Sequence, residues 1–143
     1  MSWNRFELDR HAQRIVLDAR TRDPKSLNQA YKMRANCAYG LERFWGEHLR
    51  LKGERSSQED RDKAAFIADV WSTLTTKILS KAGIELPQEV LSNQQNEATI
   101  NKVAEQLWSL GDYERQVALA VLTNFCDAIV WWTQRLKGGN DRD

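Results

Sequence analysis

The chain has 143 residues, with 21 Lys and Arg against 20 Asp and Glu, a formal net charge of +1. This length suits a single domain over residues 1–143 with a hydrophobic core of its own. Charged residues make up 29% and hydrophobic residues 41%, which excludes wholesale disorder, and 7 Gly with 2 Pro are too few for a many-turned β-sandwich. A net charge near zero is also untypical of nucleic-acid-binding domains, which are usually basic.

Apolar spacing predicts a first helix over residues 3–19, which ends before Pro24. Ser26 followed by Gln29 has the form of a capping box and predicts the start of a second helix. That helix would reach Leu51 and span about 39 Å at 1.5 Å per residue. Its apolar side consists of Ala30, Met33, Cys37, Leu41, Phe44 and Leu51.

A third helix begins at a second capping box, formed by Ser56 and Glu59. It carries an apolar stripe and ends at Gly83, which suits the left-handed position that follows many helices. Residues 84–96 show no clear pattern. Residues 92–96 are polar and are expected to form a loop, and the sequence is compatible with a short helical turn over residues 87–91.

The last part of the chain predicts helices over residues 97–110 and 113–137, with residues 137–143 as a flexible tail. No segment alternates with a period of two, so the predicted fold class is all-α, an antiparallel bundle of about five helices. The last helix is apolar on two sides, which predicts either a central position or a partner that covers it. One side carries Val117, Val121, Phe125, Ala128 and Trp132, the other carries Leu119, Cys126 and Val130, and Trp131 lies on a third side.

Three features favour a reducing, water-filled compartment. Cys37 and Cys126 have no CxxC partner, which predicts two small core residues rather than a disulfide framework. The first residues lack the apolar run of a secretory signal. Residues 117–133 are apolar but contain Asp127 and are at the short limit for a membrane span, so a helix buried in a soluble bundle is the better interpretation. The sequence therefore predicts a cytoplasmic protein without membrane contact.

The sequence contains few of the motifs that an enzyme active site would need. The two histidines, His11 and His48, stand in no HExxH motif, and neither a P-loop nor a GxGxxG is present; His48 is expected at the edge of the core. Asp62 and Asp69 share a helical face, as in all-α nucleotide pyrophosphohydrolases, but the second carboxylate pair that would complete a magnesium site is missing. The sequence therefore predicts no catalytic residue, no metal and no cofactor, and such a hydrolase stays a minor alternative.

The outward side of the second helix carries the strongest binding signal. At about 100° per residue, one group falls opposite the apolar side: Lys32, Tyr39, Arg43 and Arg50. Basic side chains at this spacing can follow a phosphate backbone, and the ring can stack on a base. An ordinary solvated face would have the same composition. Arg34 falls among apolar residues and is expected either to extend to solvent or to pair with a buried acid.

Charge is distributed unevenly along the chain. Residues 1–55 contain 12 Lys and Arg against 7 Asp and Glu, a net charge of +5, whereas residues 56–143 contain 9 against 13, a net charge of −4. Such polarity suits contact with nucleic acid, and it suits head-to-tail stacking of identical copies equally well. An adaptor that binds no nucleic acid, and that docks a partner through the last helix or Trp131, is the main alternative.

Two stretches carry a family resemblance. Residues 38–44 read Ala-Tyr-Gly-Leu-Glu-Arg-Phe, and the last helix opens on Tyr113-Glu114-Arg115 and continues with Ala128, Trp132, Arg135 and Lys137. Both are similar to motifs of the small helical subunit of type III CRISPR RNA-guided effector complexes, most closely the III-B version. The first resembles the Gly-Leu motif of that family's long N-terminal helix, and the second resembles its closing helix.

The resemblance implies a non-catalytic subunit of an antiviral ribonucleoprotein complex. Several copies would stack beside other effector subunits and contact guide RNA and target RNA. The motif positions, mostly structural ones, are Tyr39, Gly40, Leu41, Tyr113, Arg115, Trp132 and Arg135. Gly40 would permit the close approach of a neighbouring helix. The predicted RNA contacts of Lys32, Arg43 and Arg50 come from the helical face and not from the resemblance.

Overall fold

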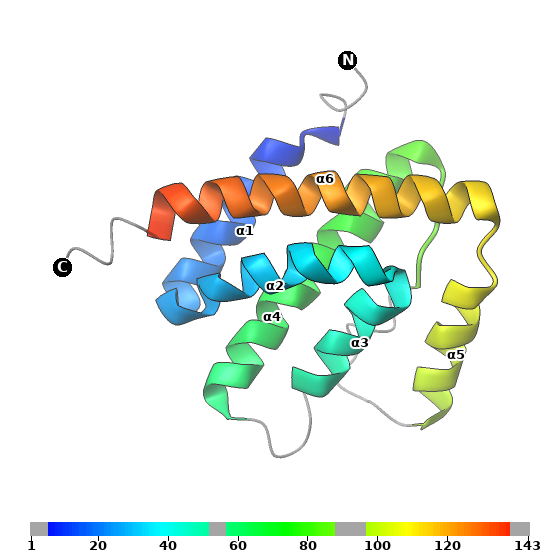
Figure 1. Cartoon of the computed structure of the whole chain (residues 1–143), viewed down its shortest axis with the longest axis horizontal. Helices are drawn as coiled ribbons and strands as arrows, with labels where there is room; N and C mark the ends of the chain where they lie inside the picture. The colour runs from blue at the N-terminus through cyan, green and yellow to red at the C-terminus, as the bar shows by residue number, and fades with distance from the viewer. Residues whose placement is uncertain (1–5, 52–56, 88–96, 138–143) are drawn as a thin grey trace.

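The computed structural model describes residues 6–51, 57–87 and 97–137, and all regular structure within them is helical, which confirms the all-α class. The α-helices of these residues, labelled in Figure 1, are α1 (Leu8–Arg22), α2 (Gln29–Asn36), α3 (Leu41–Leu51), α4 (Gln58–Thr73), α5 (Glu97–Trp108) and α6 (Asp112–Lys137). Shorter pieces are the 3₁₀ turns η2 (Pro24–Asn28), η3 (Cys37–Tyr39) and η5 (Leu79–Ala82), and the π-helical turn η4 (Leu74–Ile78).

Helix α6 crosses the whole molecule, with α2 beside it and α1 and α4 behind (Figure 1). Because it packs on both α1 and α2, one wide stripe is buried: Ala118, Val121, Leu122, Phe125, Cys126, Ile129 and Thr133. The half-buried residues on the edges of this stripe are Val117, Leu119, Ala128, Val130 and Trp132. The prediction of two separate apolar sides was therefore wrong in detail, since both belong to a single stripe that two helices cover.

The predicted long second helix is broken in the structure. Helix α2 ends at Asn36, η3 follows, and α3 begins again at Leu41. Gly40 between them has φ 98 and ψ 172, a conformation that residues with a Cβ rarely adopt. A Cβ on Gly40 would meet only the Glu42 carboxylate, at 3.7 Å, so glycine serves backbone conformation here rather than close helix packing. The predicted apolar side is nevertheless buried in full, on both sides of the break.

Two predicted helix starts move by a few residues. Asp23, not Ser26, caps the first turn of η2, because its side chain accepts a hydrogen bond from the Lys25 N–H at 3.0 Å. Ser26 is buried, and its hydroxyl donates to the Asp23 carbonyl instead. At α4 the cap is Ser57, which accepts from the Asp60 N–H at 3.1 Å. Ser56 lies outside the described residues.

The predicted third helix changes geometry before it ends. Regular α-helix stops at Thr73, and the hydroxyls of Thr75 and Thr76 both donate to the Ser72 carbonyl, which accompanies the π turn η4. Gly83 has φ 73 and ψ 19, which confirms the predicted left-handed position. Ile84, Leu86 and Pro87 are buried. The predicted turn over 87–91 lies outside the described residues after Pro87. So does the predicted tail over 137–143, except for Lys137, which is the last residue of α6.

Both cysteines are buried free thiols, as predicted. They lie on η3 and α6, where the Cys37 thiol also donates to the Met33 carbonyl at 3.4 Å. A hydrogen bond with Cys37 and complete burial raise the pKa of the Cys126 thiol well above its ordinary value. That thiol is therefore neutral and packs as a small apolar side chain.

Candidate nucleic-acid interface

The four residues predicted to bind nucleic acid are all exposed, but they do not share one helical face. Lys32 lies on α2, Tyr39 ends η3, and Arg43 and Arg50 lie on α3. The prediction placed them on one continuous helix, and the break at Gly40 makes that placement wrong. Their contact with RNA stays a prediction.

Their electrostatic surroundings differ as well. Arg50 pairs with Glu47 one helical turn away, and this hydrogen bond raises the pKa of the Arg50 guanidinium. Arg43 makes no ion pair within the described residues. Lys32 stands at the mouth of a hollow between α2 and α4, close to other lysines. Of the four, Lys32 has the surroundings that best fit a phosphate group.

A second group, which we call the basic end, lies where α6 finishes beside the start of α2: Tyr31, Trp131, Arg135 and Lys137. The Trp131 side chain is 46% exposed, and the Arg135 guanidinium lies 3.9 Å from the centroid of its ring. The Lys137 Nζ lies 5.5 Å from the centroid of the Tyr31 ring. Exposed rings beside cations are what single-stranded nucleic-acid sites use, since the ring stacks on a base while the cation meets a phosphate.

The basic end is held in place by contacts to other elements. Trp131 packs edge-on against Trp132, with ring centroids 4.9 Å apart, and the Trp132 indole N–H donates to Asp9 of α1 at 3.3 Å. Arg20 of α1 donates to the Leu136 carbonyl at 3.2 Å, which satisfies a free carbonyl at the end of α6. The rings and cations are therefore presented by a fixed helix end.

Arg34 resolves one of the sequence alternatives. It pairs with Asp127 of α6, and both side chains are about half exposed, at 40% and 56%. The hydrogen bond to Asp127 raises the pKa of the Arg34 guanidinium. Its partner is thus an acid at the surface of α6, and the pair joins α2 to α6 between the two ends of the long helix.

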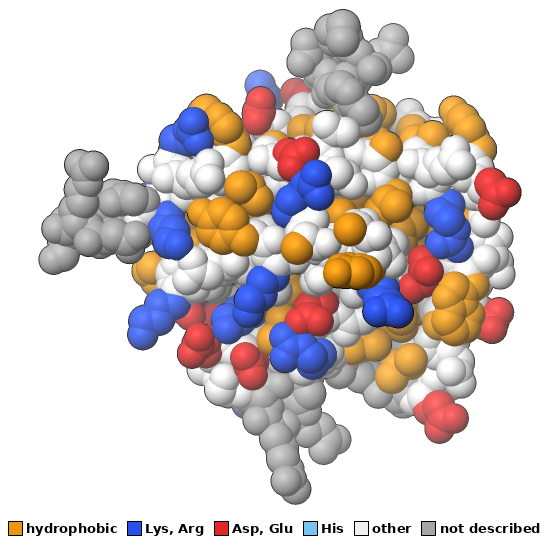
Figure 2. Space-filling view, in the orientation of Figure 1, with side chains coloured by type: hydrophobic (Ala, Val, Ile, Leu, Met, Phe, Trp, Pro, Cys, Tyr) orange, Lys and Arg blue, Asp and Glu red, His pale blue; other side chains and the backbone are white. Residues whose placement is uncertain are grey.

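A third group, which we call the acidic corner, lies at the other end of α6. It combines three exposed rings with three exposed carboxylates: Tyr39, Trp108, Tyr113, Glu105, Asp112 and Glu114. Arg115 fastens this corner, because it donates to Glu42 of α3 at 2.7 Å and to the Leu107 carbonyl of α5. Figure 2 shows acidic and hydrophobic side chains together at the right edge of the face, with most basic side chains over its left and lower parts.

Sequence reasoning found part of this arrangement. It singled out Lys32 and noted that Trp131 points away from the apolar sides, but it missed Tyr31 and the pairing of Trp131 with Arg135. Arg135 follows Trp131 by four residues, which places the two side chains together on any α-helix. That spacing could have predicted the contact between Trp131 and Arg135 from the sequence. The proximity of Tyr31 to Lys137 required the packing of α2 on α6.

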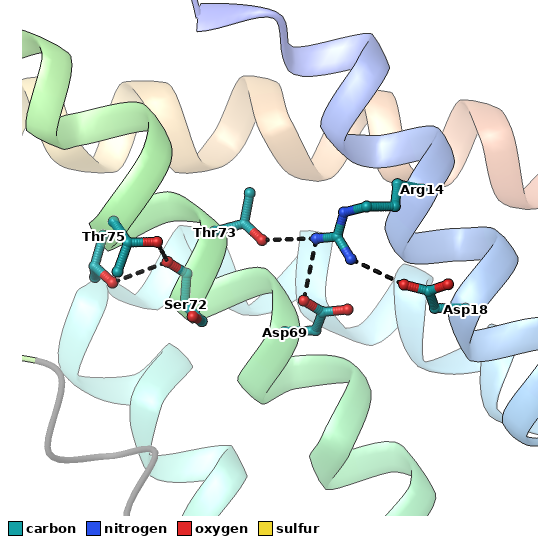
Figure 3. A network of polar contacts seen from close by, with 7 residues as sticks. Arg14, Asp18, Asp69, Ser72, Thr73 and Thr75 are labelled. Atoms are coloured by element: carbon teal, nitrogen blue, oxygen red, sulfur yellow. Dashed lines mark hydrogen bonds and ion pairs between the residues drawn. The ribbon is translucent and has the colours of Figure 1, made fainter.

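The carboxylates of the hydrolase alternative are engaged in structural contacts. Asp69 accepts a hydrogen bond from Arg14 of α1 at 3.2 Å, and Arg14 also reaches Asp18 and Thr73 (Figure 3). Asp62 is buried and accepts from Gln58 at 3.0 Å. The two carboxylates start about 10.5 Å apart along one helix, too far to share one ion. Among the described residues no group of His, Cys, Asp and Glu is arranged to hold a metal.

The histidines fit structural roles. His48 is buried on α3, as predicted for the edge of the core. Burial, followed by the positive charge of Lys77, lowers the pKa of the His11 imidazole below its ordinary value. At neutral pH His11 is therefore uncharged.

Comparison with protein-family models, curated proteins and solved structures finds no match to this chain. Helix α6 is the one helix of the described residues that is long and apolar enough to cross a membrane. This signal is weak, because the core helix of a water-soluble protein meets the same criteria.

Proposed function

We propose that this chain is a non-catalytic, RNA-contacting structural subunit of a multi-subunit assembly, as its resemblance to the small subunit of type III CRISPR effector complexes implies. On this proposal it is an antiparallel helical bundle in the cytoplasm that stacks in several copies beside guide RNA and target RNA. The observation that carries the proposal is the basic end, where two exposed aromatic rings each stand beside a cation.

The chemistry of the basic end suits a flexible, single-stranded RNA backbone. Each cation that neutralises a phosphate releases counterions, which gives affinity without sequence preference. Trp131 and Tyr31 add stacking faces that accept any base. Lys32 lies one residue from Tyr31 and extends the positive charge along α2. Contact by Tyr39, Arg43 and Arg50 stays a prediction, weakened for Arg50 by its pairing with Glu47.

The contrast between the ends of α6 supports stacking of copies. Exposed rings with acidic neighbours at one end, and exposed rings with basic neighbours at the other, are complementary surfaces on one chain. A contact between unlike surfaces of identical copies repeats head to tail and builds an open row.

Three of the residues that carry the family resemblance have structural roles. Arg115 joins three helices, Trp132 binds Asp9, and Gly40 sets the break between α2 and α3. The adaptor alternative is favoured by one observation, the acidic corner, whose rings have acidic neighbours that would repel RNA. On our proposal that corner binds the basic end of the next copy and no RNA, while the basic end contacts both RNA and that corner.

The proposal is tested by matched tryptophan variants of the full chain. We expect Trp131→Ala to weaken binding of a labelled single-stranded RNA at least about fivefold, because stacking on one base contributes about 1–3 kcal/mol. Trp108→Ala, at the acidic corner, should bind as the wild type does. The measurement is fluorescence anisotropy at two salt concentrations. Equal affinity of the Trp131→Ala variant and the wild type would contradict the proposal.

The earlier helical-face prediction is tested by single variants. We expect Lys32→Gln to lower RNA affinity more than Arg50→Gln, since Arg50 is already paired with Glu47. Arg43→Gln should fall between them. A larger loss for Arg50→Gln would restore α3 as the principal RNA-contacting helix.

A further inference from the structure

A hollow of about 280 Å³ lies between the start of α2 and the first turns of α4, on the side of α2 that carries Lys32. Its lining residues come from η2, α2 and α4: Lys25, Asn28, Gln29, Lys32, Glu59 and Lys63. On the η2–α2 side the spacing is three, one and three residues, so these side chains follow one side of a helical path. Glu59 and Lys63 are one turn apart on α4 and face them.

The charge of this hollow is unbalanced. Three lysines line it against a single carboxylate, that of Glu59, which lies 3.4 Å from the Lys63 Nζ. Glu59 is 58% exposed while Lys63 is only 20% exposed, so the ammonium group lies deeper than its partner. Lysines that line one hollow repel one another, and a bound anion would relieve the repulsion.

The wall of the hollow contains a buried polar group without a partner. Gln29 is 1% exposed, and neither its amide oxygen nor its amide nitrogen makes a hydrogen bond. An unsatisfied buried amide costs free energy, and in native proteins such groups have a reason. Both amide atoms are closed to solvent, so a bound anion would satisfy the Gln29 amide N–H once the side chain turns toward the hollow.

We propose that this hollow binds a phosphate group, with Lys25, Lys32 and Lys63 supplying charge and Gln29 supplying a neutral donor. Lysine is a common phosphate ligand in proteins. Since a water molecule takes about 30 Å³ of the liquid, the hollow has room for a phosphate and several waters. The phosphate belongs either to an RNA backbone or to the end of a nucleotide. In the backbone case the inference rests on the proposed function.

The position of the hollow fits a nucleotide. Asn28 on its rim accepts a hydrogen bond from the Lys137 Nζ, and Lys137 in turn stands beside the Tyr31 ring. A phosphate in the hollow therefore has a 39% exposed aromatic ring as a neighbour. Lys137 thus links the hollow to the Tyr31 ring of the basic end.

Inorganic phosphate tests the site without RNA. We expect titration of the full ¹⁵N-labelled chain to shift the side-chain amide signal of Gln29 and the backbone signals of Lys32 and Lys63, with saturation. Lys32→Gln with Lys63→Gln should weaken phosphate binding about a hundredfold, roughly tenfold for each charge-assisted bond. Lys77→Gln removes an exposed lysine elsewhere and should leave the affinity for phosphate unchanged. Equal affinity of the double variant and the wild type would overturn the proposal.

Gln29→Met distinguishes a phosphate-binding role of Gln29 from a purely structural one. Methionine keeps the length of the side chain and removes the unpartnered amide, so the unliganded chain should become as stable as the wild type or more stable. Phosphate affinity should nevertheless fall. A variant that loses stability and keeps phosphate affinity would show that Gln29 serves the fold alone, which overturns its assignment as a ligand.

Two RNA probes distinguish the sources of the phosphate. If a 5′-monophosphate RNA binds more tightly than the same RNA with a 5′-hydroxyl, and the double variant removes the difference, the site takes a terminal phosphate. Equal binding of the two probes, weakened equally in the double variant, indicates a backbone phosphate. Saturable phosphate binding with no RNA binding at all would contradict the proposed function while leaving the phosphate site intact. RNA binding that the double variant keeps, with no response to phosphate, would overturn the phosphate site alone.

Discussion

Helix α6 exposes aromatic rings at both of its ends, in opposite electrostatic surroundings. At the basic end, Trp131 and Tyr31 stand beside Arg135 and Lys137. At the acidic corner, the exposed charged residues nearest in sequence to Trp108 and Tyr113 are the carboxylates Glu105, Asp112 and Glu114. Exposed rings alone would suggest two equivalent contact surfaces. On our proposal, these neighbours decide that RNA binds only at the basic end, while the acidic corner binds only protein.

The basic end and the acidic corner are far enough apart along α6 to make separate contacts. Tyr113 and Trp131 are 18 residues apart on one helix, about 27 Å. On our proposal, the acidic corner of a copy contacts its neighbour about 27 Å from the residues of its own basic end that contact RNA. The Arg34–Asp127 pair between them holds α2 against α6.

Charge reversal at either end should have the largest effect. We expect Asp112→Lys with Glu114→Lys to abolish self-association of the chain, and Arg135→Glu with Lys137→Glu to do the same, because like charges across a contact cost several kcal/mol. That corresponds to a loss of at least a hundredfold in affinity. Sedimentation velocity over a range of concentrations measures it.

A mixture of the two charge-reversed variants provides the control. Each variant alone carries the same sign at both ends, whereas the mixture again places opposite signs together. Association should therefore return in the mixture and be lost at high salt. Association of either variant alone would show that the ends of α6 do not meet.

Removal of Arg115 should have an intermediate effect, on the stability of the acidic corner. Arg115→Ala breaks the bonds to Glu42 and to the Leu107 carbonyl and leaves Glu42 half-buried without its cation. We expect a loss of about 2 kcal/mol in the free energy of unfolding, measured with urea. Arg43→Ala on the same surface has no partner to lose and should stay within about 0.5 kcal/mol. Equal losses for both variants would refute the assignment of Arg115 as the residue that fastens the corner.

The smallest expected effect is a pH dependence of stability, which arises at His11 and involves neither the basic end nor the acidic corner. Because the pKa of His11 is lower in the folded than in the unfolded chain, the unfolded chain binds more protons as the pH falls through the ordinary histidine range. Stability should therefore be complete above about pH 6.5 and decline below it. His11→Gln should flatten this decline, as measured by urea unfolding at pH 7.5 and 5.5. A wild-type chain that is more stable at pH 5.5 than at pH 7.5 would contradict this prediction.

Much of the fold follows from the sequence, because apolar spacing fixes which side chains are buried. The helical class, the buried side of residues 30–51 and the left-handed Gly83 were all predicted and confirmed. The break at Gly40 was not, since a single glycine within an apolar helical pattern is compatible with both a continuous and a broken helix. Tertiary packing decided between them.

The candidate site was predicted less well, for a related reason. Lys32 was identified because charge on an outward helical face is a local property. Its neighbour Lys63 comes from α4, and the Lys137 that stands beside Tyr31 comes from the end of α6. No local pattern indicates that these residues meet. The unpartnered amide of Gln29 likewise becomes visible only once its surroundings are known.

The most direct test of the central claim is a map of photochemical crosslinks between the full chain and a single-stranded RNA. We predict crosslinks at Tyr31 and Trp131, at the basic end, and none at Trp108 or Tyr113 of the acidic corner. High salt should remove them, since the contact depends on phosphate charge. Crosslinks concentrated at the acidic corner, with Tyr31 and Trp131 unmodified, would contradict the assignment of the two ends.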